Sequence, residues 1–205
     1  MAYAGDNLPR CTVLVFLRRL LLHMLYPLAY MLGRFNTGSS HGNTTRRLAP
    51  RYAELQDLVP GDIIVSRTKW RPTNPLIPGY WSHAGMYVGN DTVVHALAPH
   101  VVETPLQDFM SMVDAMAVVR PWRTGRYIMS QAAAHMRSFV GTPYDFMFEP
   151  TTKALYCSEA VAQAYWAVTD DWTFIARKRM GLVTVLPQDF YDARKHFTVV
   201  WDSRA

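Results

Sequence analysis

The chain has 205 residues, half of them apolar, which is enough to bury one domain-sized core. Its two cysteines, Cys11 and Cys157, are too few for a disulfide framework or a four-thiolate metal site, so packing must stabilise the fold. The net charge of +5 is concentrated in an N-terminal arm, because residues 1–51 carry seven arginines and one aspartate, for +6, and the remainder sums to −1.

Residues 11–32 are almost wholly apolar but carry Arg18 and Arg19 in their middle. Two adjacent arginines are costly at the centre of a bilayer and interrupt the apolar region of a signal peptide, so neither a simple spanning helix nor a clear cleavable signal peptide is predicted. At helical spacing the arginines lie opposite the leucines, which predicts a basic amphipathic helix within an arm of residues 1–35. Such a helix can lie on an anionic membrane surface, on its own domain or on a partner, and the pattern leaves all three open.

Residues 36–50 are rich in Gly, Ser, Thr and Asn and predict a flexible linker, after which a single domain is expected over residues 51–205. The basic arm favours work at a membrane or in the cell envelope. Localisation stays uncertain at this point, because no clear cleavable signal peptide is present.

The first half of the domain reads as short β-strands separated by turns, expected at residues 62–66, 81–88, 92–96, 100–104 and 116–120. Residues 89–91, Gly-Asn-Asp, predict a hairpin between the second and third of these strands. If the loop holds three residues, Ala84 pairs with Ala96, and His83 and His95 project from the same face of the sheet. A two-residue loop would place the two histidines on opposite faces.

The second half predicts helices over residues 126–140 and 157–166, a short helix over residues 187–192 and a last strand over residues 197–201. Gly141 would end the first helix, and Pro187 would begin the third. A group of helices beside a mostly antiparallel sheet is an α+β fold.

Cys157 follows a loop that contains Gly141, Pro143 and Pro150, and it falls in the first turn of its predicted helix. The helix dipole and the free N–H groups there would stabilise a thiolate and lower the thiol pKa. A lone cysteine among apolar residues is nevertheless more often a small buried hydrophobe. Its assignment as a nucleophile therefore depends on a histidine elsewhere in the chain.

Five motifs occur in order along the domain, at residues 60–64 (PGDII), 82–89 (SHAGMYVG), 94–96 (VHA), 141–145 (GTPYD) and 156–159 (YCSE). Together they resemble the circularly permuted NlpC-type papain-fold cysteine hydrolases. The likeness is greatest to the YiiX/YebB-like branch, which is related to the lecithin retinol acyltransferase-like proteins. In this permuted group the histidine strand precedes the cysteine helix, as it does here. The resemblance covers about residues 55–201 and implies a permuted papain-like fold with the catalytic cysteine at a helix N-terminus.

The resemblance implies that Cys157 is the nucleophile, that His83 is its base and that His95 is the third residue, which orients the base. The Cys157 backbone N–H would then stabilise the oxyanion. Further candidates for oxyanion or substrate binding are Tyr144, Tyr156 and Ser82. This set of groups would let a thiolate attack an acyl carbon and form a thioester, which water or another acceptor resolves.

The predicted function is therefore that of a cysteine hydrolase, an amidase or peptidase acting on an amide in a cell-wall peptide or an N-acyl substrate. Two alternatives remain open from the sequence, a membrane-associated lipid acyltransferase or thioesterase and a non-catalytic binding module of the same fold. No nucleic-acid partner is predicted, because the basic run at residues 177–179 lacks interleaved aromatic residues. The remaining histidines have no partner at ligand spacing, so neither a metal nor an organic cofactor is implied.

Overall fold

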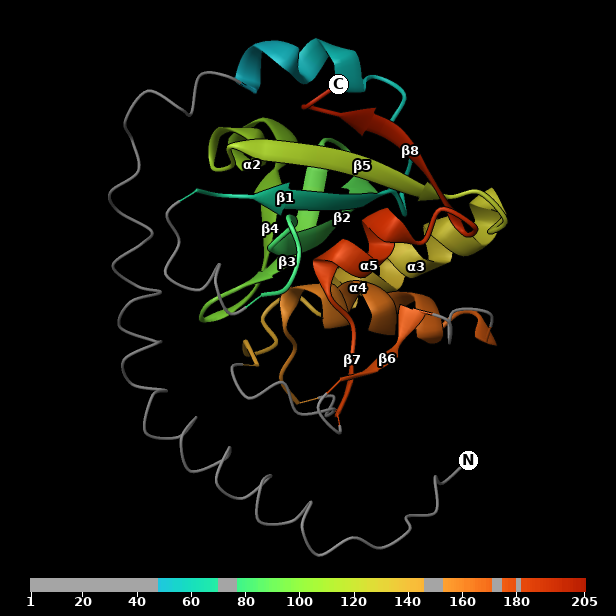
Figure 1. The fold of residues 1–205 in the computed structure, drawn as a ribbon. Helices are drawn as coiled ribbons and strands as arrows, with labels where there is room; N and C mark the ends of the chain where they lie inside the picture. Colours follow the sequence, from blue (N-terminus) through green and yellow to red (C-terminus); the bar gives the residue numbers. More distant parts are fainter. Residues whose placement is uncertain (1–47, 70–76, 146–152, 171–174, 180–181) are drawn as a thin grey trace, which may run out of the picture.

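The computed structural model describes residues 48–69, 77–145, 153–170, 175–179 and 182–205 (Figure 1). The predicted arm of residues 1–35 and most of the predicted linker lie outside the described residues. The described part begins at Leu48, whose side chain is buried against the domain.

The centre of the fold is a six-stranded sheet in the order β4-β3-β2-β1-β5-β8, and neighbouring strands are antiparallel throughout. The strands are rich in valine and alternate their side chains between two buried faces, as a sheet covered on both sides requires. Their bounds are β1 Ile63–Arg67, β2 His83–Gly89, β3 Thr92–Leu97, β4 His100–Pro105, β5 Ala115–Pro121 and β8 Phe197–Asp202.

Helices cover both faces of this sheet, and each face has its own apolar cluster (Figure 1). On one face, α3 (Arg126–Ser138), α4 (Cys157–Trp166) and α5 (Pro187–Asp192) pack over Ile63 and Val65. On the other, α2 (Leu106–Ser111) and the 3-10 helix η1 (Ala49–Leu55) pack over Ile64. The predicted α+β arrangement, an antiparallel sheet packed with helices, is therefore confirmed.

The β2–β3 hairpin has the two-residue loop considered in the sequence, but its strands pair in the register expected for three residues. Gly89 pairs with Thr92 across a two-residue turn, in which Asn90 and Asp91 adopt positive φ angles of 52° and 54°. A bulge between Tyr87 and Gly89 then shifts the register by one residue, so that Met86 pairs with Val94. Beyond the bulge this is the register expected for a three-residue loop, and His83 and His95 share one face.

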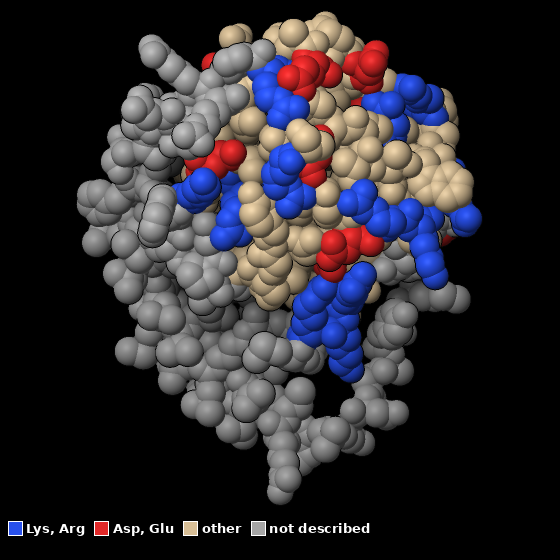
Figure 2. All heavy atoms as spheres, turned by 45° about the horizontal axis from the view of Figure 1, so that its top comes forward, with Lys and Arg blue, Asp and Glu red and all other residues tan. Residues whose placement is uncertain are grey.

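The sequence does not predict α2, β6 (Arg177–Arg179) or β7 (Leu182–Thr184), because these elements are too short to show a periodic pattern. The helix α2 has six residues, and β6 and β7 form a separate two-stranded ribbon. Within the ribbon, Arg179 donates a hydrogen bond to buried Asp189 at 2.6 Å, so this part of the basic run binds its own domain. On the face drawn in Figure 2, Lys and Arg lie interspersed with Asp and Glu.

Among the described residues no helix combines the length and apolar character needed to cross a membrane.

The Pro-Gly-Asp motif fastens the start of β1 to three other elements. Asp62 is fully buried and receives hydrogen bonds from Arg120 on β5 at 2.6 and 2.7 Å. Gly61 has a φ of +97°, and an added Cβ would lie 2.7 Å from Met129 on α3. Its carbonyl oxygen accepts the Tyr165 hydroxyl from α4 at 2.7 Å. The motif therefore joins the sheet to both helices.

We expect Asp62→Asn to lower the free energy of unfolding by about 2 to 4 kcal/mol, because it leaves the Arg120 guanidinium without its buried counter-charge. Urea denaturation measures this loss. Glu103→Gln is the matched control, since its ion pair with Arg137 is exposed and should contribute less than about 0.5 kcal/mol. Equal losses in the two variants would contradict the anchoring role of Asp62.

Candidate active site

The two predicted histidines meet on the sheet. His83 is the first residue of β2 and His95 lies in β3, and the His83 Nε2 atom is 2.9 Å from the His95 Nδ1 atom. On its far side, the His95 Nε2 atom is 3.0 Å from the Thr104 hydroxyl oxygen on β4. These three polar groups form a chain across three adjacent strands.

Two apolar features allow this pairing. Gly85 lies on β2 beside His95, and a Cβ at that position would come within 3.0 Å of the His95 Cβ and 3.1 Å of Val93. Phe109 of α2 packs edge-on against the His95 ring at a centroid distance of 5.1 Å and stacks near His83 at 6.2 Å. His95 is consequently only 2% exposed, and its ring is held between the sheet and α2.

The hydrogen-bond chain allows two sets of tautomers. In one, His83 donates from Nε2 to His95, His95 donates from Nε2 to Thr104, and the Nδ1 atom of His83 keeps a basic lone pair. In the other, every donor and acceptor is reversed, and Nδ1 of His83 carries a proton. Only the first set makes His83 a base toward a further group.

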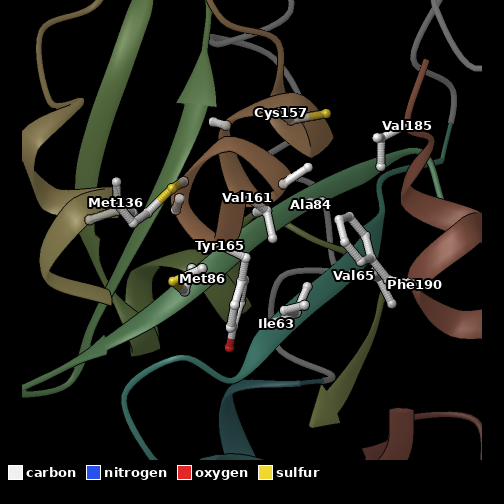
Figure 3. Packing of buried hydrophobic residues seen from close by; sticks show 14 of the residues in the cluster. Ile63, Val65, Ala84, Met86, Met136, Cys157, Val161, Tyr165, Val185 and Phe190 are labelled. Carbon is white, nitrogen blue, oxygen red and sulfur yellow. The ribbon is translucent and has the colours of Figure 1, made fainter. Parts of the chain in front are cut away.

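Cys157 is the first residue of α4, as predicted, and this helix packs across β2. Figure 3 shows the cysteine at the edge of the apolar cluster, beside Ala84. Burial raises the pKa of the thiol, and the backbone N–H groups of Ala84 and Ser158 oppose that shift. The expectation that the helix start alone would lower this pKa is wrong, because desolvation of the sulfur outweighs the N–H groups. Ala84 directly follows His83, so the sulfur is held against the start of the histidine strand.

The start of α4 is fixed by its own neighbours. The Ser158 hydroxyl donates to the Val185 carbonyl at 2.8 Å, and the Tyr156 hydroxyl accepts the Val185 N–H at 3.1 Å. Residues on both sides of Cys157 are thereby tied to one segment of the chain. Tyr156, predicted for oxyanion or substrate binding, is buried, and its hydroxyl accepts the Val185 N–H.

The Gly-Thr-Pro-Tyr-Asp motif lies beside the segment that leads into α4. Tyr144 and Leu155 form a parallel bridge, and Asp145 donates its N–H to the Leu155 carbonyl at 3.1 Å. Tyr144 is half-buried, and its own N–H binds the Pro99 carbonyl at 2.9 Å. The motif therefore bridges the edge of the sheet at β4 and the residues just before Cys157.

Ser82, the remaining predicted site residue, directly precedes His83. It is 7% exposed, and its N–H donates to the Ser66 carbonyl of β1 at 3.1 Å. Its position next to His83 in the chain keeps it at the histidine end of the site.

Glu159 is a buried carboxyl group two residues after Cys157. Its pKa is raised to about 8, mainly by burial and also by the nearby Asp145 carboxylate, while the backbone N–H of Tyr156 opposes the shift. The Tyr156 N–H lies 3.4 Å from the Glu159 Oε2 atom. Glu159 is therefore largely protonated at neutral pH and itself adds little negative charge to the start of α4. An acidic residue in a first turn ordinarily complements the helix dipole as a charged group, and burial keeps this one protonated instead.

Sequence reasoning did not single out Thr104, Gly85 or Phe109 for the site. Thr104 is two residues from Val102, the cross-strand partner of His95, so it lies on the same face as that histidine. In the sequence, Thr104 is only a polar residue in a predicted strand. It becomes a candidate partner of His95 once the strand register shows that the two residues share a face.

Over residues 57–200 the chain matches the family described as "Permuted papain-like amidase enzyme, YaeF/YiiX, C92 family". Among solved structures it is similar to the metalloprotein yiiX from Escherichia coli O157:H7, with a TM-score of 0.59 and 21% identity. That similarity covers 70% of this chain and 96% of the other, and at such identity it concerns the fold. No curated protein matches the chain.

A metal ion does not fit this site as described. In the part of the chain that the structure describes, no three His, Cys, Asp or Glu side chains are grouped so that they could hold one. No catalytic step is therefore derived through a metal.

We expect Gly85→Ala to separate the two histidines, because the added methyl group would press on the His95 Cβ. The cost should be about 1 to 3 kcal/mol in unfolding free energy. Imidazole NMR signals of His83 and His95 should also change together. Gly125→Ala is the control, since a Cβ there meets nothing within 4 Å; a similar cost at both positions would contradict the steric argument.

Glu159→Gln should alter how stability depends on pH. Between its ordinary pKa near 4.5 and the folded value of about 8, the unfolded chain releases the Glu159 proton and the folded chain keeps it. The wild type therefore loses stability as pH rises through this window, by at most about 1.4 kcal/mol per pH unit. Urea unfolding at pH 5, 6.5 and 8 should show a smaller loss for Glu159→Gln; parallel curves would argue against a protonated Glu159.

Proposed function

The chain belongs to the permuted papain-like amidase family, and we propose that it is a cysteine amidase or peptidase with Cys157 as nucleophile and His83 as base. The observation that carries this assignment is the hydrogen-bond chain from Thr104 through His95 to His83, on the strand that also holds Ala84 against the Cys157 sulfur. The same strand therefore brings the polar chain and the thiol to one end of the sheet.

The reaction begins with proton transfer from the Cys157 thiol to the Nδ1 atom of His83. In the tautomer in which His83 donates from Nε2 to His95, the Nδ1 atom carries the lone pair that takes this proton. The Nδ1 atom of His95 accepts a hydrogen bond from the Nε2–H group of His83 and so stabilises the imidazolium. Thr104 accepts a hydrogen bond from His95 and holds that ring in the required tautomer.

The thiolate attacks the carbonyl carbon of a substrate amide, and the carbonyl electron pair moves onto oxygen. The Cys157 backbone N–H at the start of α4 can donate to this oxyanion, assisted by the dipole of the ten-residue helix. Tyr144, which lies beside the residues preceding Cys157, is the proposed second donor.

Collapse of the tetrahedral intermediate breaks the C–N bond, and the His83 imidazolium gives its proton to the departing amine. A thioester remains on Cys157. Water then loses a proton to His83 and attacks the thioester carbon, and the sulfur leaves and recovers the proton. The products are a carboxylic acid and an amine. The chemistry suits the amide of a cell-wall peptide or of an N-acyl substrate.

Burial of the sulfur explains why the base is needed. A thiol whose pKa is raised by desolvation is mostly protonated near neutral pH, and an isolated cysteine in this position would react slowly. An imidazolium partner offsets that cost only when a thiolate forms beside it. Reactivity should therefore depend strongly on His83.

We expect iodoacetamide to alkylate Cys157 in the full chain at pH 7 about tenfold faster or more in the wild type than in His83→Ala, because without the imidazole the buried thiol keeps its raised pKa and little thiolate forms. Intact-protein mass spectrometry of timed samples measures the rate. Cys157→Ala shows whether the label is on this residue, and Cys11→Ala removes the other cysteine.

Equal labelling of the wild type and His83→Ala would sink the hydrolase assignment and favour a binding module of the same fold. A wild type whose Cys157 resists alkylation from pH 6 to 9 would have the same meaning.

A further inference from the structure

The catalytic base stands at the end of a long connection. β1 ends at Arg67 and β2 begins at His83, and residues 77–82 are the described part of the connection that leads into β2. The last turn of this connection, residues 79–82, delivers His83 to the first position of β2. Its geometry is set by contacts with α5 and with the C-terminal residues.

One side chain of α5 holds the backbone of this turn. The Gln188 Oε1 atom accepts the N–H of Tyr80 at 2.8 Å and the N–H of Trp81 at 3.1 Å. Tyr80 precedes His83 by three residues and Trp81 precedes it by two. The amide oxygen of Gln188 thereby satisfies two consecutive backbone donors that no strand partner reaches.

The turn is shaped to receive this amide. Gly79 has a φ of +102°, a left-handed conformation that glycine adopts without strain. A Cβ at Gly79 would lie 2.7 Å from both the Cβ and the Cγ of Gln188. The backbone therefore approaches Gln188 more closely than any other residue at position 79 would permit.

Further side-chain contacts hold the turn and α5 together. The Gln188 Nε2 atom donates to the Asp192 carboxylate at 2.8 Å. The Arg204 guanidinium lies over the rings of Tyr80, Trp81 and Tyr191, at 4.6, 4.5 and 5.1 Å from their centroids. Trp81 is fully buried beneath these contacts. The amide is thus held at both ends and cannot easily rotate away from the turn.

We propose that Gln188 is a positioning residue for the base, setting the direction in which the chain enters β2 and so the alignment of the His83 ring with His95 and Cys157. This inference rests on the proposed role of His83. A hydrogen bond of 2.9 Å between two imidazole nitrogens tolerates little displacement, and misplacement by about 1 Å can slow a reaction by two orders of magnitude.

The test is the rate of Cys157 alkylation by iodoacetamide in the full chain as a function of pH. Gln188→Met keeps the side-chain length but removes the acceptor, and we expect it to slow labelling at pH 7 about tenfold and to move the profile toward higher pH, as His83→Ala does. Gln188→Glu combined with Asp192→Asn keeps an acceptor for both N–H groups and a hydrogen bond between positions 188 and 192, so this pair should restore most of the rate. The matched control is Gln107→Met, at an exposed position of α2, which should label like the wild type.

A double variant distinguishes positioning from general loosening of the fold. If Gln188 acts through His83, adding Gln188→Met to His83→Ala should change the labelling rate less than twofold. A further tenfold loss in that background, or an unchanged pH profile for Gln188→Met alone, would overturn the proposal. Thermal unfolding of each variant ensures that the rates compare folded proteins.

The outcomes separate the two proposals. A wild type that labels independently of His83 refutes the hydrolase assignment itself. A wild type that depends on His83 but is indifferent to Gln188 leaves the hydrolase intact and refutes only the positioning role.

Discussion

The hydrogen bond between His83 and His95 is the constraint on which the site depends. It forms only if β2 and β3 present both residues on one face, and a two-residue turn by itself would place them on opposite faces. The bulge between Tyr87 and Gly89 restores the face by shifting the register one residue. Gly85 then leaves room for the His95 Cβ, which a side chain at position 85 would crowd at 3.0 Å. The turn, the bulge and the glycine therefore act together to bring His83 and His95 into contact.

The second constraint is the burial of Cys157. Packing α4 on the sheet places the sulfur against the histidine strand, but it also raises the thiol pKa by removing water. Two features of the site offset the raised thiol pKa. His83 supplies an imidazole, and the neighbouring carboxyl group of Glu159 stays uncharged. Glu159, two residues along the same helix, is itself buried and holds its proton to about pH 8, so it adds little negative charge near a thiolate. Burial thus opposes ionisation of the thiol and of the carboxyl group, and only the thiol has an imidazole on the adjoining strand.

Much of this arrangement could be predicted from the sequence, because it follows from local patterns. Strand positions, the helix that begins at Cys157, the α+β class and the family resemblance all rest on periodicity, turn residues and motif order, and the structure and the family match confirm them. The bulge could not be predicted, since it depends on how the twisted strands close their turn. The pKa of Cys157 depends on how deeply α4 packs, and the contact of Gln188 with the turn before His83 joins residues more than a hundred positions apart. Such quantities appear only when the chain is folded.

Some of the sequence motifs carry the reactive groups, and others hold the elements that bear those groups in place. Asp62 binds Arg120 on β5, and the Gly61 carbonyl accepts the Tyr165 hydroxyl of α4, so the Pro-Gly-Asp motif fixes the far end of the cysteine helix to the sheet. The Gly-Thr-Pro-Tyr-Asp motif connects the edge of β4 to the residues just before Cys157. The cysteine helix is thereby attached to the sheet at both ends. A nucleophile on one element and a base on another can stay aligned only if those elements cannot slide, and the motifs without reactive groups supply that restraint.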